Sequence, residues 1–182
     1  MDADHVAGDL ESVLLTEDEI GTRVRSLAAE IGTDYADREI VLVGVLGGAA
    51  TFTVDLARAL EQQVEIDWMA IRSYTTSKRA SGSVRLLKDL DLDITDRDVI
   101  IAETVIQTGL TMSWLIANLR QRRPASIAVA ALLRKPDTPE LGVPTYVGFD
   151  VPAGLIDGYG LDYRGRYRNL RCAAMLAPQA VR

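Results

Sequence analysis

Hydrophobic and polar positions along the chain follow two periods, one typical of helices and one typical of buried strands. The segment Thr16-Glu17-Asp18-Glu19 has the spacing of a capping box, in which residues 16 and 19 bond each other's backbone N–H groups. Apolar residues then recur every three or four positions and predict a helix to about Tyr35. Its apolar face is formed by Ile20, Val24, Leu27, Ala28 and Ile31.

The rest of the pattern predicts strands and helices in alternation. Predicted strands cover residues 40–46, 64–71, 84–87, 98–102, 126–133 and 146–149, and predicted helices cover residues 49–61 and 111–122. Residues 1–12 are polar and predict a mobile tail. Residues 72–83 are polar, basic and glycine-containing, which is typical of a flexible loop long enough to act as a lid. Repeated βαβ units predict a parallel α/β fold, in which ligands bind beyond the carboxyl ends of the strands.

Composition narrows the class of protein. A length of 182 residues favours a single domain, and 48% hydrophobic with 25% charged residues is typical of a soluble globular protein. The net charge of −6 argues against non-specific binding to nucleic acid or to a membrane. No apolar run reaches the ~18 residues that span a membrane, and no signal-peptide pattern opens the chain. We therefore expect a cytoplasmic protein.

The single cysteine and the single histidine exclude two kinds of chemistry. Cys172 lies in an apolar stretch, which predicts a buried structural thiol. His5 lies in the polar tail, so a histidine-based triad or a histidine-rich metal site is excluded.

The most informative stretch is VIIAETVIQTGLT, residues 99–111. An apolar strand runs into acidic Glu103, then into a turn with Gly109, then directly into a helix. The helix N-terminus offers unpaired N–H groups and the positive end of its dipole, while Thr108 and Thr111 add hydroxyl donors. This assembly suits a phosphate monoester. The residues alone leave open the alternative of an ordinary βα turn with a threonine cap.

The stretch resembles the phosphoribosyl-pyrophosphate signature of type I phosphoribosyltransferases, and the chain resembles their hypoxanthine-guanine branch from about Val13 to Pro178. The other matching pieces are LVGVLGGAATF (42–52), Ser73-Tyr74, VRLLKDLD (84–91), LLRKPD (132–137), YVGFDVP (146–152) and GYGLDYRGRYRNL (158–170). The resemblance implies the type I phosphoribosyltransferase fold, a mostly parallel central sheet flanked by helices with a small hood. It also implies a homodimer or homotetramer. The reaction would join a purine nitrogen to C1 of ribose 5-phosphate and expel pyrophosphate, with Mg²⁺ present.

The resemblance also assigns a role to individual residues. The sugar phosphate would be held by Gln107, Thr108, Gly109, Leu110 and Thr111. Pyrophosphate would be bound by Gly47, Gly48, Ser73, Tyr74 and Arg168. The purine would be surrounded by Lys135, Leu155, Ile156, Asp157 and Asp162. The candidate Mg²⁺ ligands are Glu103 and Asp162.

Departures from the family cluster at the reacting centre, around the catalytic candidates Glu103, Thr104 and Gln107. The family has aspartates at positions 104 and 107, and the second is usually assigned as the general base. An amide cannot take a proton at neutral pH, and loss of a general base typically costs about 10²–10⁴ in rate. In addition, Gly47 replaces the usual lysine of the pyrophosphate loop, Leu155 replaces the aromatic residue that stacks on the base, and Asp157 replaces an apolar residue.

Three hypotheses follow from these departures. The first is an active transferase whose donor carries a carbon substituent at the anomeric position, such as a pyrophosphate of allulose (psicose) 6-phosphate. The base would be adenine, and Asp157 would accept a hydrogen bond from its 6-amino group. Such an enzyme is similar to an adenine phosphoallulosyltransferase of angustmycin-type nucleoside biosynthesis. Lys135 alone would favour a 6-oxopurine. The second hypothesis is a catalytically silent nucleotide- or sugar-phosphate-binding protein, and the third is an inactivated variant of a hypoxanthine-guanine salvage enzyme.

Overall fold

A six-stranded sheet carries the buried apolar runs of the chain. The computed structural model describes residues 1–74 and 83–181. In spatial order the strands are β4 (Ser83–Lys88), β3 (Val64–Tyr74), β2 (Ile40–Leu46), β5 (Asp98–Ile106), β6 (Ser126–Arg134) and β7 (Thr145–Asp150). All of them run parallel except β4, which pairs antiparallel with β3. The predicted α/β class with a mostly parallel sheet is confirmed.

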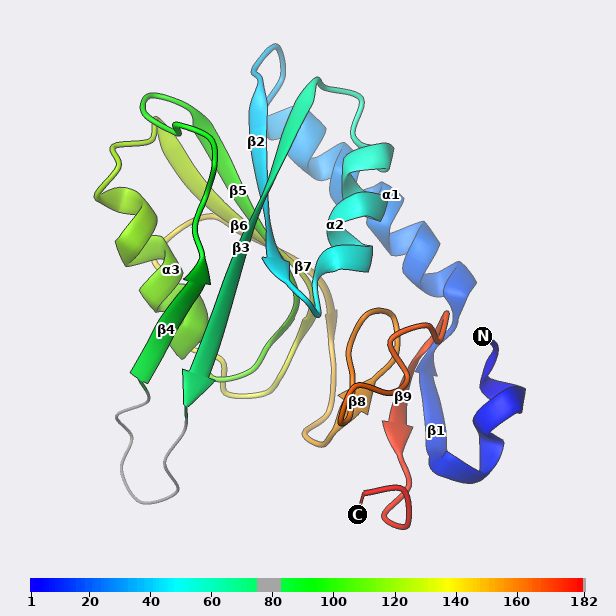
Figure 1. The fold of residues 1–182 in the computed structure, drawn as a ribbon. Coiled ribbons are helices and arrows are strands. Elements are labelled where there is room, and N and C mark those ends of the chain that lie inside the picture. The colour runs from blue at the N-terminus through cyan, green and yellow to red at the C-terminus, as the bar shows by residue number, and fades with distance from the viewer. Residues whose placement is uncertain (75–82, 182) are drawn as a thin grey trace.

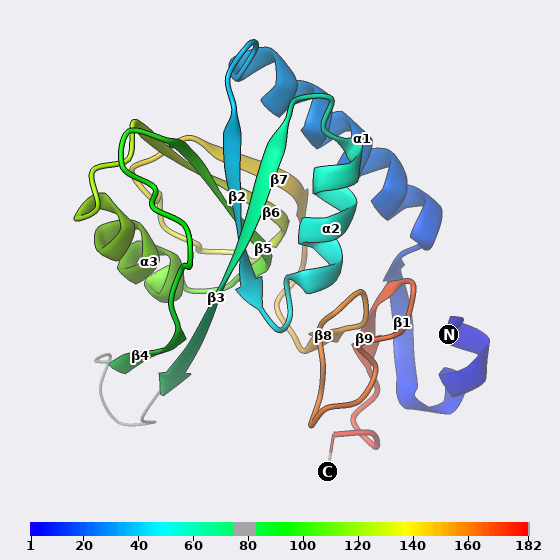
Figure 2. The ribbon, with the colours of Figure 1, turned by 45° about the horizontal axis from the view of Figure 1, so that its top comes forward.

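Three α-helices cover the two faces of this sheet (Figures 1 and 2). Helices α1 (Glu17–Asp34) and α2 (Ala50–Ala59) lie on one face, and α3 (Leu110–Arg120) lies on the other. Alternate residues of a strand point to opposite faces, so each strand contributes side chains to two hydrophobic cores. In β2, Leu42 packs in the core under α1 and α2, whereas Val43 packs in the core under α3.

Helix α1 begins as predicted. The Thr16 hydroxyl accepts from the N–H of Glu19, and a Glu19 carboxylate oxygen accepts from the N–H of Thr16 at 2.8 Å. The five apolar residues expected on its inner face are the five that are buried. None of the described helices combines the length and the apolar character needed to cross a membrane.

A second, smaller sheet forms the hood. It consists of β1 (Leu10–Leu15), β9 (Ala173–Leu176) and β8 (Ile156–Asp157), paired antiparallel in that order. Residues 1–12, expected to form a mobile tail, instead make up the 3-10 helix η1 (Ala3–Asp9) and the start of β1. The N-terminal segment is held because the Tyr167 hydroxyl donates to Asp9 at 2.8 Å. Cys172 is buried in this part of the molecule, as predicted.

Two strands end three or more residues later than the sequence predicts. Strand β5 continues to Ile106 instead of ending at Ala102, because Val105 and Ile106 still pair with β6. The turn between this strand and the next helix is therefore shorter than predicted. Strand β3 extends to Tyr74, within the segment expected to be a loop. The rest of the predicted lid, residues 75–82, lies outside the described residues.

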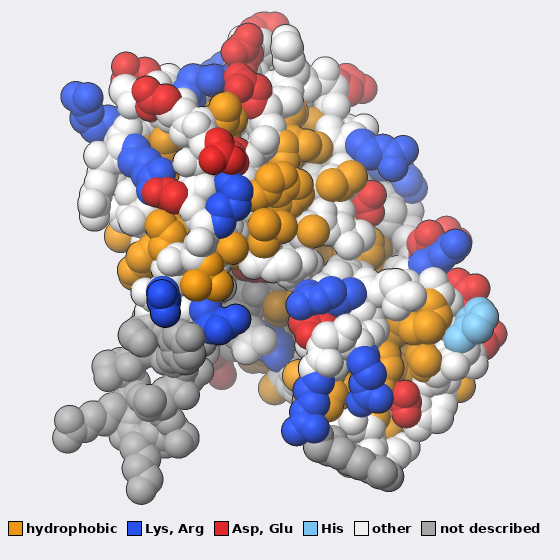
Figure 3. All heavy atoms as spheres, viewed as in Figure 1, with side chains coloured by type: hydrophobic (Ala, Val, Ile, Leu, Met, Phe, Trp, Pro, Cys, Tyr) orange, Lys and Arg blue, Asp and Glu red, His pale blue; other side chains and the backbone are white. Residues whose placement is uncertain are grey.

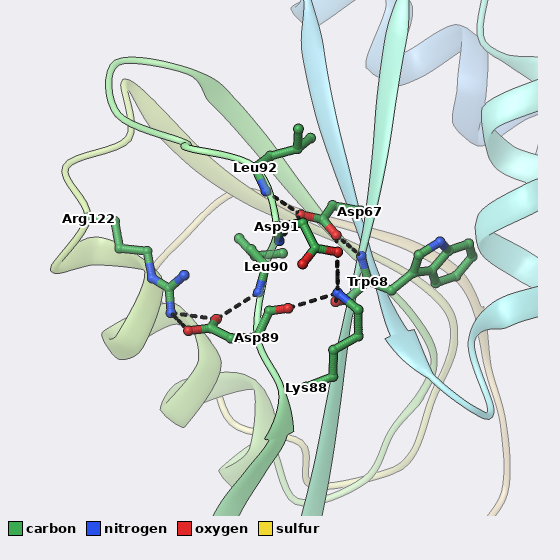
Figure 4. A network of polar contacts seen from close by, with 8 residues as sticks. All are labelled: Asp67, Trp68, Lys88, Asp89, Leu90, Asp91, Leu92 and Arg122. Carbon is green, nitrogen blue, oxygen red and sulfur yellow. Dashed lines mark hydrogen bonds and ion pairs between the residues drawn. The ribbon is translucent and has the colours of Figure 1, made fainter.

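The segment that follows β4 is fixed by one buried carboxylate (Figure 4). Asp67 on β3 accepts hydrogen bonds from the N–H groups of Asp91 at 2.7 Å, Leu92 at 2.9 Å and Trp68 at 2.7 Å, and it lies 3.5 Å from the Lys88 ammonium. Burial raises the pKa of Asp67, but these donors and the Lys88 charge outweigh burial and hold the pKa below its usual value. The contact ties the antiparallel edge of the sheet to its parallel interior.

Candidate active site

A cavity of about 470 Å³ opens beyond the carboxyl ends of β2 and β5. Its walls bring together Gly48, Glu103 and residues 107–112, together with Ile71 of β3. The predicted phosphate-binding stretch and the predicted acidic residue therefore share one site. Among the described residues that line this cavity, Glu103 is the only ionisable one.

The predicted phosphate loop ends at the N-terminus of α3. Gly109 directly precedes α3. Its backbone is in the left-handed conformation, with φ of 69°. Gln107 and Thr108 are exposed beside it. The first N–H groups of α3 and the positive end of its dipole face the cavity. Thr138, which the sequence analysis missed, fixes the loop by donating from its hydroxyl to the carbonyl oxygen of Gln107 at 2.8 Å.

The predicted pyrophosphate loop at Gly47-Gly48 is held from two sides. Thr104 is fully buried, and its hydroxyl donates to the carbonyl oxygen of Gly48 at 3.0 Å. On the hood side, a Cβ at Gly160 would clash with the same oxygen, so glycine is required there. Thr104 is absent from the cavity lining, so the structure places this catalytic candidate behind the loop.

Position 47 is open. A Cβ built on Gly47 would make only van der Waals contact with the Arg168 guanidinium, at 3.8 Å. Arg168 itself donates to the carbonyl oxygen of Gly160 at 2.6 Å and forms an ion pair with Asp162 at 2.6 Å. The predicted pyrophosphate residues 47, 48 and 168 thus lie together. The backbones of Ser73 and Tyr74 end strand β3.

The Glu103 carboxyl lies in a desolvated position. The side chain is half-buried, and one carboxylate oxygen accepts from the N–H of Thr104 at 2.8 Å. Burial raises the pKa of Glu103 to about 7, although the N–H groups of Thr104 and Val105 act in the opposite direction.

The predicted purine residues lie between the end of β6 and the hood. Lys135 follows β6, and its ammonium donates to the carbonyl oxygen of Gly154. Leu155 is 40% exposed, while Ile156 and Asp157 in β8 are buried. Burial, together with the nearby charge of Asp162, raises the pKa of Asp157 to about 6, and Lys135 opposes this shift.

The donor set for a metal is sparse. Within the described part of the chain, no three His, Cys, Asp or Glu side chains are grouped to hold a metal ion. Asp162 bonds Arg168 and also accepts from the N–H of Gly165 at 2.6 Å. Mg²⁺ commonly takes one or two carboxylates and completes its shell with substrate phosphates and water. Glu103 and Asp162 carry the carboxylate oxygens that a magnesium site of that kind would use.

A helix N-terminus at the carboxyl ends of parallel strands is the anion-binding arrangement of nucleotide- and phosphate-binding α/β proteins. Residues 13–164 match the family model of the phosphoribosyl transferase domain. The chain is 48% identical to the hypoxanthine-guanine phosphoribosyltransferase of Mycobacterium avium, over 94% of this chain and 88% of that protein.

Solved structures agree. A hypoxanthine phosphoribosyltransferase from Staphylococcus aureus superposes with a TM-score of 0.91 at 35% identity, covering 98% of this chain and 97% of that one. For a Trypanosoma cruzi hypoxanthine phosphoribosyl transferase, solved in a study of how its C-terminal region affects oligomeric state and activity, the TM-score is 0.87 at 35% identity. That match covers 94% of this chain and 93% of the other. The chain belongs to the hypoxanthine-guanine phosphoribosyltransferase family. It is accordingly an enzyme of the glycosyltransferase class that acts on a purine.

Proposed function

We propose that this enzyme joins adenine to the anomeric carbon of a ketohexose 6-phosphate pyrophosphate, such as that of allulose, and releases pyrophosphate in nucleoside antibiotic biosynthesis. The observation that carries the proposal is the hydrogen bond from Thr104 to Gly48. A hydroxyl at the position of a family carboxylate is buried and committed to the loop, so it supplies no charge to the cavity. With Gln107 also uncharged, Glu103 is left as the ionisable group among the described cavity residues.

A ketose donor matches such a centre. Its anomeric carbon bears an extra carbon, so the oxocarbenium ion formed as pyrophosphate leaves is tertiary and needs less stabilisation from nearby carboxylates. The extra carbon also needs space. Gly47 provides it, because a Cβ there would lie 3.8 Å from the nearest atoms. A ribose donor needs no such space.

Each group in the site then has a role. The N–H groups of residues 107–111 hold the terminal phosphate of the sugar. Arg168 and the Gly47-Gly48 backbone hold pyrophosphate, which departs with the electron pair of the broken C–O bond. A purine ring nitrogen forms the new C–N bond and releases its proton to solvent, while the Gln107 amide oxygen accepts a hydrogen bond from the ring.

The remaining polar groups hold sugar and metal. Glu103 accepts hydrogen bonds from the sugar hydroxyls. Glu103 and Asp162 are the residues that would hold Mg²⁺, which neutralises the charge of pyrophosphate when it is bound.

Pyrophosphate release tests the proposal. The protein is incubated with Mg²⁺ and every pairing of adenine, hypoxanthine or guanine with either phosphoribosyl pyrophosphate or the allulose 6-phosphate donor. We expect release above background with the ketose donor. Absence of release with any pairing would contradict a transferase and favour a silent binding protein.

A double variant distinguishes the ketose transferase from an inactivated salvage enzyme. Restoring both carboxylates as T104D/Q107D should lower turnover of the ketose donor. Strong gain of activity with phosphoribosyl pyrophosphate, and no ketose activity in the parent, would instead identify an inactivated salvage enzyme.

We also infer that the protein is a homo-oligomer. Val54 of α2 and Ile66 of β3 are 41% and 40% exposed, and Trp68 lies half-buried beside them. Figure 3 shows a continuous apolar surface on this side of the molecule. A second copy of the chain is the expected occupant, since the C-terminal region of the Trypanosoma cruzi relative has a role in its oligomeric state.

A further inference from the structure

Asp157 is the most unusual buried group in the protein. It is the second residue of β8 and is fully buried. Neither of its carboxylate oxygens has a hydrogen-bond partner among residues 1–74 and 83–181. A buried carboxyl without partners destabilises the folded state, whatever its protonation. Its presence therefore requires a reason other than stability.

The surroundings of Asp157 indicate a missing partner. Lys135 and Asp162 lie near enough to act on it electrostatically, and Tyr167 of the hood is also within range. Lys135 does not bond it, and the Lys135 ammonium donates instead to the carbonyl oxygen of Gly154. An acceptor and a donor therefore lie near each other without contact, beside the residues that the family uses for the purine.

We propose that Asp157 selects the base, with a carboxyl oxygen that accepts a hydrogen bond from the exocyclic amino group of a 6-aminopurine. The inference rests on the proposed function in one respect, that the ligand is a purine nucleotide or base. A 6-oxopurine presents lone pairs at the same position, so Asp157 faces it acceptor to acceptor. The Lys135 ammonium could offset this repulsion by donating to the 6-oxo group. Because it is bonded to Gly154, it offsets the repulsion less than a free lysine would.

The thermal stability of a variant distinguishes a base-selecting Asp157 from one that only supports the fold. Replacing Asp157 with Val removes an unpartnered buried polar group at similar volume. The thermal unfolding temperature of the ligand-free Asp157→Val variant should therefore rise or stay unchanged. A clear fall in the unfolding temperature would show that the carboxyl supports the fold, and would overturn the inference.

Equilibrium binding gives the direct test, without requiring turnover. AMP and IMP share the ribose 5-phosphate and differ at the purine 6-position, so the phosphate loop contributes equally to both. We expect calorimetric titration to show AMP binding more tightly than IMP by roughly 10- to 100-fold. The Asp157→Val variant should lose that factor, and Asp157→Asn, which keeps an acceptor oxygen, should retain most of it.

Tyr167→Phe provides a matched control in the hood. It removes the bond to Asp9 and should weaken both nucleotides equally, leaving their ratio unchanged. Equal affinities in the parent protein, or an unchanged ratio in Asp157→Val, would overturn the inference and leave the transferase proposal standing. Failure to bind either nucleotide would overturn the proposed function, and the inference with it.

Discussion

The carbonyl oxygen of Gly48 is the point at which β5 and the hood meet the proposed pyrophosphate loop. Thr104 donates to it from one side, and Gly160 packs against it from the other. A family carboxylate position has thus become a support for the loop. A group that acts through the loop should affect both stability and turnover when it is removed.

Thr104→Val should show both effects. The valine leaves the Gly48 carbonyl without its donor, which should lower the unfolding free energy by about 1–3 kcal/mol. Because the loop would then be less well fixed, kcat/KM should fall by about 10-fold to 100-fold. Urea denaturation and pyrophosphate release measure the two. Thr104→Ser keeps the hydroxyl and should resemble the parent; equal loss in both variants would contradict the role of the bond.

Gly47→Lys tests whether the open position accommodates the ketose substituent. The side chain would fill the space next to Arg168. The ratio of kcat/KM for the allulose donor to that for phosphoribosyl pyrophosphate should fall by roughly 10-fold or more. Gly47→Ala, which adds one methyl group where a Cβ fits, should change the ratio much less. A ratio unaffected by lysine would argue against steric selection of the donor at this position.

Among the elements, the β3–β4 edge depends on the buried carboxylate of Asp67 (Figure 4). Asp67→Asn keeps one acceptor oxygen but loses the charge and places an NH₂ group against backbone donors. The unfolding free energy should fall by about 2–3 kcal/mol, measured by urea denaturation at neutral pH. Asp89→Asn, at an exposed carboxylate bonded to Arg122 on the same segment, is the control and should change stability little.

The same residue predicts a pH dependence. The pKa of Asp67 is lower in the folded protein than the value of about 3.9 expected in the unfolded chain. Its contribution to stability is therefore complete above the unfolded pKa and is lost as the pH falls through the folded pKa. Acid titration of unfolding should give a shallower loss of stability below pH ~4 in Asp67→Asn than in the parent. Parallel curves would contradict this assignment.

The sequence pattern was sufficient to predict those elements whose contacts are local or recur with a regular period. The face of α1 followed from a period of three to four residues, and the capping box followed from Thr16 and Glu19. The alternation of strands and helices was sufficient to predict the parallel sheet. The turn at Gly109 and the helix after it also followed from the sequence, because both depend on local backbone geometry.

Contacts between distant segments were not predictable in this way. Thr104 was expected at the reacting centre from its family position, yet its hydroxyl is bound to Gly48, a partner 56 residues away in sequence. Nothing local to Thr138 shows that it bonds Gln107. The strands of the hood were not predicted because β1, β8 and β9 are short, and because β1 finds its partner β9 across nearly the whole chain.

At the scale of the whole molecule, the apolar surface on α2 and β3 (Figure 3) predicts self-association. Ile66→Glu places a charge in this surface and should raise the dissociation constant of the oligomer by roughly 100-fold. Analytical ultracentrifugation measures the change. Val13→Glu alters a residue of similar exposure, 43%, in the hood and serves as the control. An unchanged sedimentation coefficient in Ile66→Glu, or equal dissociation in both variants, would place the interface elsewhere.

The pairing of β1 with β9 also sets an order of assembly during synthesis. Strand β1 is made among the first residues of this sequence, but its partner spans residues 173–176. The central sheet and the phosphate loop are complete before that partner leaves the ribosome, and folding proceeds along the chain as it emerges. The purine side, which includes β8, can close only after residues 173–176 have been translated. A prematurely terminated chain would therefore have a phosphate loop but no complete base site.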